Sequence, residues 1–150
     1  MNLNSEFDFN KYLEDNTKGY NGKYSEYITL IPSLYRLLCD LLESDELPKK
    51  IRPDIYLTIG YLYYPNDLYS EEEHGPLGFL DDLMLILVVL RKCSIQEDAG
   101  IEFIKQFTSG INYPIDQLLT NDYDKITKEN KVLFEDLLTV SGMRFYYKDY

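Results

Sequence analysis

The sequence contains no tryptophan, one histidine (His74) and two cysteines (Cys39 and Cys93). A single histidine leaves little basis for a Ser-His-Asp or Cys-His arrangement, and no nucleophile elbow accompanies it. The two cysteines form no C-x-x-C pair, so we expect free thiols in a reduced, cytoplasmic protein. Glycine-rich phosphate loops, HExxH motifs and EF-hand loops are also missing. Because hydrolases, kinases and nucleases would need such residues, we expect a non-enzymatic protein.

Long apolar runs are absent as well. The longest uninterrupted run spans residues 83–90, whereas a helix that crosses a membrane needs about 20 apolar residues. Residues 1–16 are acidic and contain no apolar segment, so no signal peptide is expected. We therefore predict that the chain has no integral membrane segment.

Positive charge is scarce. Fifteen Lys and Arg residues stand against 26 Asp and Glu residues, which gives a formal net charge of −11. Such a surface repels phosphate backbones, so direct binding to nucleic acid is not expected. It favours a protein partner with a basic face, although acidity also serves solubility alone.

Helical periodicity is what the chain has in abundance. Apolar residues recur at helical spacing almost throughout, and no Asn-Gly or Asp-Gly hairpin signal is present. We predict one all-α domain over residues 1–150, a compact bundle of six or seven helices with a central apolar helical hairpin. Pro32 is expected to start or kink a helix, and Ser94 and Thr127 to cap later ones. The predicted core comprises Ile55, Ile59, Leu62, Leu83, Ile86, Leu87 and Leu90.

Residues 61–91 contain the one motif-like stretch, in which carboxylates surround a predicted turn between two helices. Asp67 lies in that turn, and Asp81 and Asp82 begin the next helix. If the helices pack as an antiparallel hairpin, these carboxylates meet at one end of it, where they would hold a divalent cation with help from His74. The alternative is structural, since Asp is common in turns and in first helical turns. A close cluster would need backbone amides, a cation, or an arginine such as Arg52 or Arg91.

The same stretch resembles the YkvA-like bacterial domain of unknown function over about residues 51–91. The resemblance rests on the order of a Pro-x-Asp turn and a Gly-x-x-Asp-Asp helix start, followed by an apolar helix. It implies a compact helical hairpin with buried carboxylates and supplies no reaction. The intervening loop is longer and more acidic here than in that family. The matching residues are Pro65, Asp67, Gly78, Asp81 and Asp82.

Two functions follow from these patterns. The first is a small acidic protein that binds another protein, such as an immunity protein, an antitoxin or a phage-defence accessory protein. Its expected contacts are Tyr69, Glu71, Glu72 and Glu73, since tyrosine is an efficient interface residue. The second is a carboxylate-based metal-binding domain or metal enzyme built on Asp67, Asp81 and Asp82. Tyrosines expected on the surface are Tyr20, Tyr24, Tyr27, Tyr69, Tyr146, Tyr147 and Tyr150.

Overall fold

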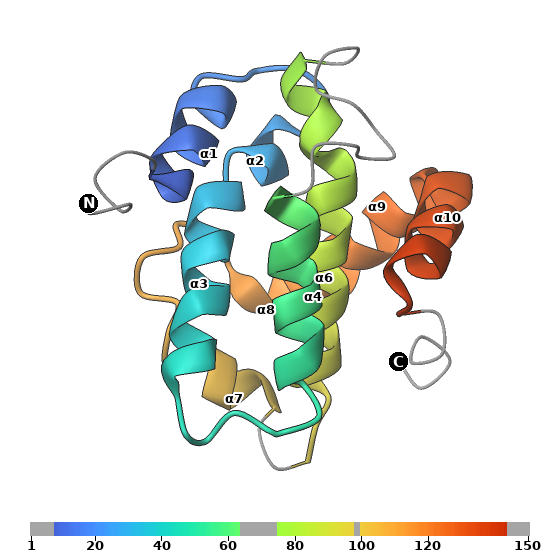
Figure 1. The fold of residues 1–150 in the computed structure, drawn as a ribbon. Helices are drawn as coiled ribbons and strands as arrows, with labels where there is room; N and C mark the ends of the chain where they lie inside the picture. The colour runs from blue at the N-terminus through green and yellow to red at the C-terminus, as the bar shows by residue number, and fades with distance from the viewer. Residues whose placement is uncertain (1–7, 64–74, 98–99, 144–150) are drawn as a thin grey trace, which may run out of the picture.

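The computed structural model describes residues 8–63, 75–97 and 100–143, and this part of the chain is helical without any strand (Figure 1). Counting the continuous helical run over residues 115–129 as one helix and leaving aside the single turn α2, it contains seven helices, which confirms the predicted all-α bundle. The helices are α1 (Phe9–Thr17), α2 (Ser25–Ile28), α3 (Ile31–Glu43), α4 (Arg52–Tyr63), α6 (Leu80–Ser94), α7 (Gly100–Lys105), α8 (Ile115–Gln117), α9 (Tyr123–Glu129) and α10 (Lys131–Ser141), with a 3-10 turn η2 (Gly75–Phe79) and a π turn η3 (Leu118–Asp122).

Local sequence signals explain several helix ends. Asp8 caps α1 by accepting a hydrogen bond from the Lys11 amide, at 3.2 Å. Pro32 lies in the first turn of α3, where its missing N–H costs nothing, so it starts a new helix after α2. The predicted caps Ser94 and Thr127 were wrong: each hydroxyl donates to a carbonyl of its own helix, so Ser94 ends α6 and Thr127 lies inside α9.

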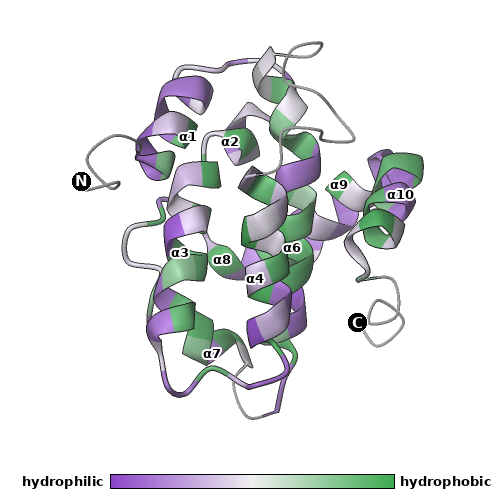
Figure 2. Ribbon diagram, viewed as in Figure 1, coloured by the Kyte–Doolittle hydropathy of each residue, from purple (hydrophilic) through white to green (hydrophobic). Residues whose placement is uncertain are grey.

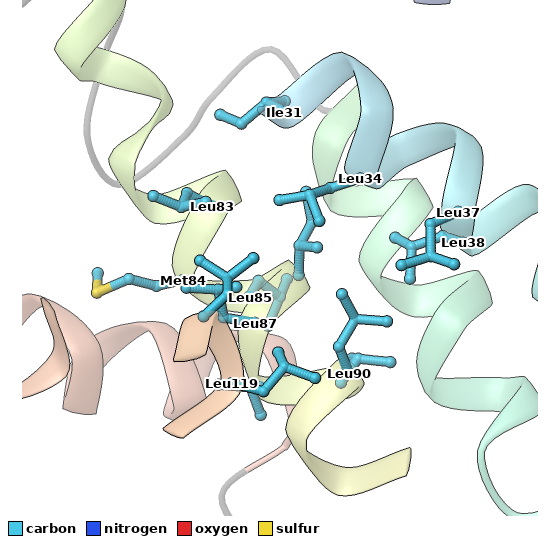
Figure 3. Packing of buried hydrophobic residues seen from close by; sticks show 14 of the residues in the cluster. Ile31, Leu34, Leu37, Leu38, Leu83, Met84, Leu85, Leu87, Leu90 and Leu119 are labelled. Atoms are coloured by element: carbon cyan, nitrogen blue, oxygen red, sulfur yellow. The ribbon is translucent and has the colours of Figure 1, made fainter. Parts of the chain in front are cut away.

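Helix α6 is the centre of the molecule. It packs against α4, α7, α10, α3 and the run from η3 to α9. Figure 3 shows leucines of α6 and α3 meeting in this core, together with Leu119 of η3. Six of the seven predicted core residues are buried and Ile59 is half-buried. The buried members are Ile55, Leu62, Leu83, Ile86, Leu87 and Leu90.

The predicted central hairpin is formed by α4 and α6, which pack against each other. A buried ion pair between Asp54 and Lys92 joins the first turn of α4 to the last turn of α6. Near the other end, the Tyr61 hydroxyl donates to Asp81, at 2.7 Å. Polar contacts therefore tie the hairpin at both ends while apolar packing fills its middle. No helix within the described ranges is long and apolar enough to cross a membrane.

Candidate protein-binding surface

The two predicted site aspartates that the structure describes lie in the interior. Asp81 and Asp82 occupy the first turn of α6, and both are buried. The Asp81 carboxylate accepts from the Tyr61 hydroxyl and, at 2.9 Å, from the Asp82 backbone amide. Amide bonding is one of the arrangements that the sequence predicted for this cluster. These contacts give Asp81 a structural role at the open end of the hairpin.

Other predicted site residues lie outside the described part of the chain, namely Asp67, Tyr69, Glu71, Glu72, Glu73 and His74. The proximity of Asp67 to Asp81 and Asp82 therefore stays a prediction. Within the described ranges, no group of three His, Cys, Asp or Glu side chains has the geometry to hold a metal ion.

The two arginines proposed as carboxylate partners contact backbone carbonyls instead. Arg52 donates to the carbonyl oxygens of Leu42 and Ser44, at 2.7 and 3.1 Å, which satisfies groups left open where α3 ends. Arg91 donates to the carbonyl oxygen of Leu119 in the π turn. Both arginines thus stabilise chain segments far from the aspartates at the start of α6.

A surface that the sequence did not single out lies along the outer side of α4. Tyr56, Leu57, Gly60 and Tyr63 follow one another at helical spacing, and all four are exposed. Tyr56 is 58% exposed, Tyr63 50% and Leu57 40%, so three large side chains present apolar area to solvent on one helix. We call these four residues the α4 face. The signal for it was present in the sequence, because the apolar residues of α4 run around the whole helix instead of forming one stripe.

Aromatic rings extend the α4 face towards α1 and α3. The Tyr63 ring stacks on Phe9, with centroids 4.0 Å apart, and Phe9 in turn stacks on Tyr12, which is 41% exposed. The hydroxyls of Tyr35 and Tyr63 are hydrogen-bonded at 3.1 Å. These contacts hold the rings of Tyr12, Tyr35 and Tyr63 against Phe9, so the aromatic surface at this end of α4 is preordered.

Exposed carboxylates lie on two helices that contact α4. On α3 these are Asp40 and Glu43, and burial of the nearby Cys39 thiol together with their charges raises its pKa. On α10 they are Glu135 and Asp136. Arg36, the only cation of α3, forms an ion pair with Glu14, at 2.7 Å.

Two tyrosines predicted to be exposed are instead buried, and a third, Tyr20, is half-buried. Tyr27 of α2 donates its hydroxyl to Asp122, at 3.0 Å, and Tyr113 donates to the other oxygen of the same carboxylate. Burial and the Asp122 contact raise the pKa of Tyr27 well above the ordinary tyrosine value. Tyr24 donates to Glu129, at 2.8 Å. The prediction of exposure was wrong because each hydroxyl has a partner about a hundred residues away in the sequence.

Comparison with known proteins finds an uncharacterized relative of the chain. No family model matches it, and no solved structure matches it. Among curated proteins, it is similar to "Uncharacterized protein ORF9" of Methanothermobacter thermautotrophicus, with 29% identity over 119 residues. The match covers 79% of this chain and 80% of the relative. The similarity therefore extends over most of both chains and brings no activity with it.

Proposed function

We propose that this chain is a non-enzymatic protein that binds a partner protein with a basic surface, and that the α4 face is its central contact. The observation that supports this most directly is the exposure of Tyr56, Leu57 and Tyr63 on one side of a single helix. Scattered exposed apolar side chains are normal, whereas a contiguous apolar patch with a polar rim is typical of an interaction site. Tyrosine is also enriched among the residues that contribute most to binding.

Gly60 is a second argument for this surface. It lies in the interior of α4, where glycine costs about 0.5–1 kcal/mol relative to alanine. A Cβ built on Gly60 would meet no described atom within 4 Å outside its neighbouring backbone, so packing within the fold does not require glycine. The space around the Gly60 Cα is open to solvent among the described residues. We infer that a side chain of the partner approaches the backbone of α4 at Gly60.

The negative charge of the chain indicates that its partner has a basic surface. A second copy of the chain would bring a net charge of −11 against an equal charge, and like charges oppose such a contact. A partner with lysines or arginines around an apolar centre would be attracted instead. Immunity proteins, antitoxins and phage-defence accessory proteins that neutralise basic toxins are the classes that fit this description. Because both cysteines are free thiols, we place the encounter in the cytoplasm.

The YkvA-like resemblance remains a proposal of its own. It implied a helical hairpin with buried carboxylates, and the α4–α6 hairpin with buried Asp81 and Asp82 supports it. On this proposal the hairpin is the shared element, and the acidic segment between its helices is particular to this chain.

The proposal is tested by comparative capture from the native host. Wild-type protein and a Tyr56→Ser/Leu57→Ser double variant are each used as bait, and any protein retained only by wild type is purified. Its association rate is then measured at low and high ionic strength. We expect the double variant to lose at least about tenfold in affinity, as hot-spot truncation does. The association rate should fall as salt rises, because charge attraction is screened.

Ile95→Ser is the matched control, since Ile95 is 46% exposed but lies outside the α4 face. This variant should bind the captured protein as wild type does. A partner that binds the double variant and wild type equally would refute the α4 face as the contact. A salt-independent association rate would refute the basic partner.

A further inference from the structure

A pocket of about 430 Å³ lies where the end of α6 meets α7 and the π turn η3. Its lining is mostly apolar, with Ile95, Ile101 and Leu119 as the main contributors. Ile95 is 46% exposed, so its side chain presents apolar area at this site. The volume is within the range of pockets that hold small molecules. The polar side chains of the lining are Arg91, Ser94, Asp116 and Thr120.

Arg91 is held in a defined orientation beside this pocket. Its Nη1 donates to the Leu119 carbonyl oxygen, at 2.5 Å, and its guanidinium lies over the Tyr123 ring, 5.2 Å from the centroid. A π turn shifts the backbone hydrogen-bond register, which frees a carbonyl for such a contact, and π turns occur often at functional sites. Among the described residues neither Nε, which is buried, nor Nη2 has a hydrogen-bond partner, so Nη2 is the guanidinium nitrogen that can still donate to a ligand.

Among the polar side chains that line the pocket, Arg91 is the one that can still donate a hydrogen bond to a ligand. The Ser94 and Thr120 hydroxyls already donate to the carbonyl oxygens of Arg91 and Asp116, both at 2.7 Å. The Asp116 carboxylate is paired with Lys105, at 2.8 Å. Arg91 has no carboxylate within ion-pair distance in the described part of this strongly acidic chain. An unpaired guanidinium with an N–H group still free to donate favours a carboxylate as its partner.

We infer that this pocket binds a small carboxylic acid with an apolar body. The carboxylate accepts a hydrogen bond from Nη2 of Arg91, and the apolar body packs against Ile95, Ile101 and Leu119. Asp116 stays at the rim with Lys105. The site is separate from the α4 face and does not depend on a protein partner.

Octanoate and octan-1-ol serve as matched probes, because they share the apolar chain and differ in the carboxylate. Binding to the full chain is measured by titration calorimetry, with the unfolding free energy of each variant determined in parallel. We expect saturable one-to-one binding of octanoate, and at least about tenfold weaker binding of octan-1-ol, since hydrogen bonds to charged groups are strong. Arg91→Lys should weaken octanoate binding by about tenfold, because lysine keeps the charge but cannot place a donor at the Nη2 position of the planar guanidinium.

Ile95→Asp and Ile95→Asn form a second pair that avoids any role of Arg91 in folding. Both remove apolar contact, and only the aspartate adds a charge that repels the ligand, so Ile95→Asp should bind octanoate several-fold more weakly than Ile95→Asn. Tyr56→Ala should bind octanoate as wild type does. Equal affinity for octanoate and octan-1-ol, or binding of octanoate that does not saturate, would overturn the inference. Equally tight binding of acetate would also overturn it, because the apolar lining would then contribute nothing.

Discussion

The two helices of the central hairpin, α4 and α6, have similar apolar content but differ in how much of it is buried. Residues of α6 from Leu80 to Leu90 are all buried, and the middle of this helix is continuously hydrophobic in Figure 2. Helix α4 buries Ile55 and Leu62 but exposes Tyr56 and Tyr63. A helix that is apolar all round is expected to be surrounded. Within the described residues α4 contacts α6, α3 and α10, and none of these helices covers Tyr56 and Tyr63.

The ion pairs of the molecule show the same contrast between buried and exposed settings. The Asp54–Lys92 pair joins side chains that are only 8% and 6% exposed, whereas the Arg36–Glu14 pair joins side chains 58% and 45% exposed. A buried pair contributes little net stability when intact, yet removing one partner leaves an unpaired charge in the interior. An exposed pair is screened by solvent at all times.

The largest effect is expected from breaking the buried pair. Lys92→Met leaves the Asp54 carboxylate without its buried cation, and we expect a loss of about 3–5 kcal/mol in unfolding free energy, measured by denaturant titration. The double variant Asp54→Leu/Lys92→Met should recover most of that loss. Glu14→Gln, which breaks the exposed pair, should cost less than about 1 kcal/mol. Equal losses in the buried and exposed pairs would contradict the contrast.

The next largest effect compares a leucine in each helix of the hairpin. Leu87→Ala removes a fully buried side chain of α6 and should cost about 2–5 kcal/mol. Leu57→Ala, at a position 40% exposed on α4, should cost about 1 kcal/mol or less, because folding removes less of the Leu57 side chain from water. Both are measured by denaturant titration. A loss below about 0.5 kcal/mol for Leu87→Ala would mean that α6 is not the core helix.

A smaller effect is expected from the buried tyrosines at alkaline pH. The pKa of Tyr27 is raised by burial and by its contact with Asp122, so the folded chain keeps a proton that the unfolded chain releases near pH 10. The stabilisation is complete below that pH and is lost as the pH rises towards the folded-state pKa. Tyr27→Phe should therefore flatten part of the alkaline decline in unfolding free energy. It should also cost about 1–2 kcal/mol at neutral pH, because Asp122 loses a donor.

Tyr56→Phe provides the exposed counterpart for that measurement. Because Tyr56 is 58% exposed, removing its hydroxyl should leave the stability at neutral pH within about 0.5 kcal/mol of wild type. If Tyr27→Phe and Tyr56→Phe gave the same pH profile, the burial of Tyr27 would have no energetic consequence.

The smallest effect has the opposite sign. Gly60→Ala should stabilise the fold by about 0.5–1 kcal/mol, because alanine is the better helix former and its Cβ has room. The same variant should weaken binding to the captured partner, since the methyl group takes up space beside the α4 backbone that the partner would approach. If the variant is more stable and binds normally, Gly60 does not contribute to binding. The contributions of Tyr56 and Tyr63 are then tested by substitutions at those two positions.

Much of the helical architecture was predictable from local sequence, because helical periodicity and capping act over a few residues. The apolar run over residues 83–90 predicted α6, and Asp81 and Asp82 marked its start. Ser94 was misassigned because a serine hydroxyl caps a following helix or bonds back into its own with similar ease, and here it bonds to the Arg91 carbonyl.

The sequence by itself determined the helical class, the central apolar hairpin and the acidity of the surface, since periodicity and composition are properties of short segments and of their sum. The tertiary structure decided which apolar residues are covered. Tyr27 is buried because Asp122 approaches it from 95 positions away, and Tyr56 is exposed because no described helix packs on that side of α4. Asp54 likewise meets Lys92 across 38 positions. Such contacts depend on how helices pack, and two helices with the same periodicity can pack in many ways that local sequence does not distinguish.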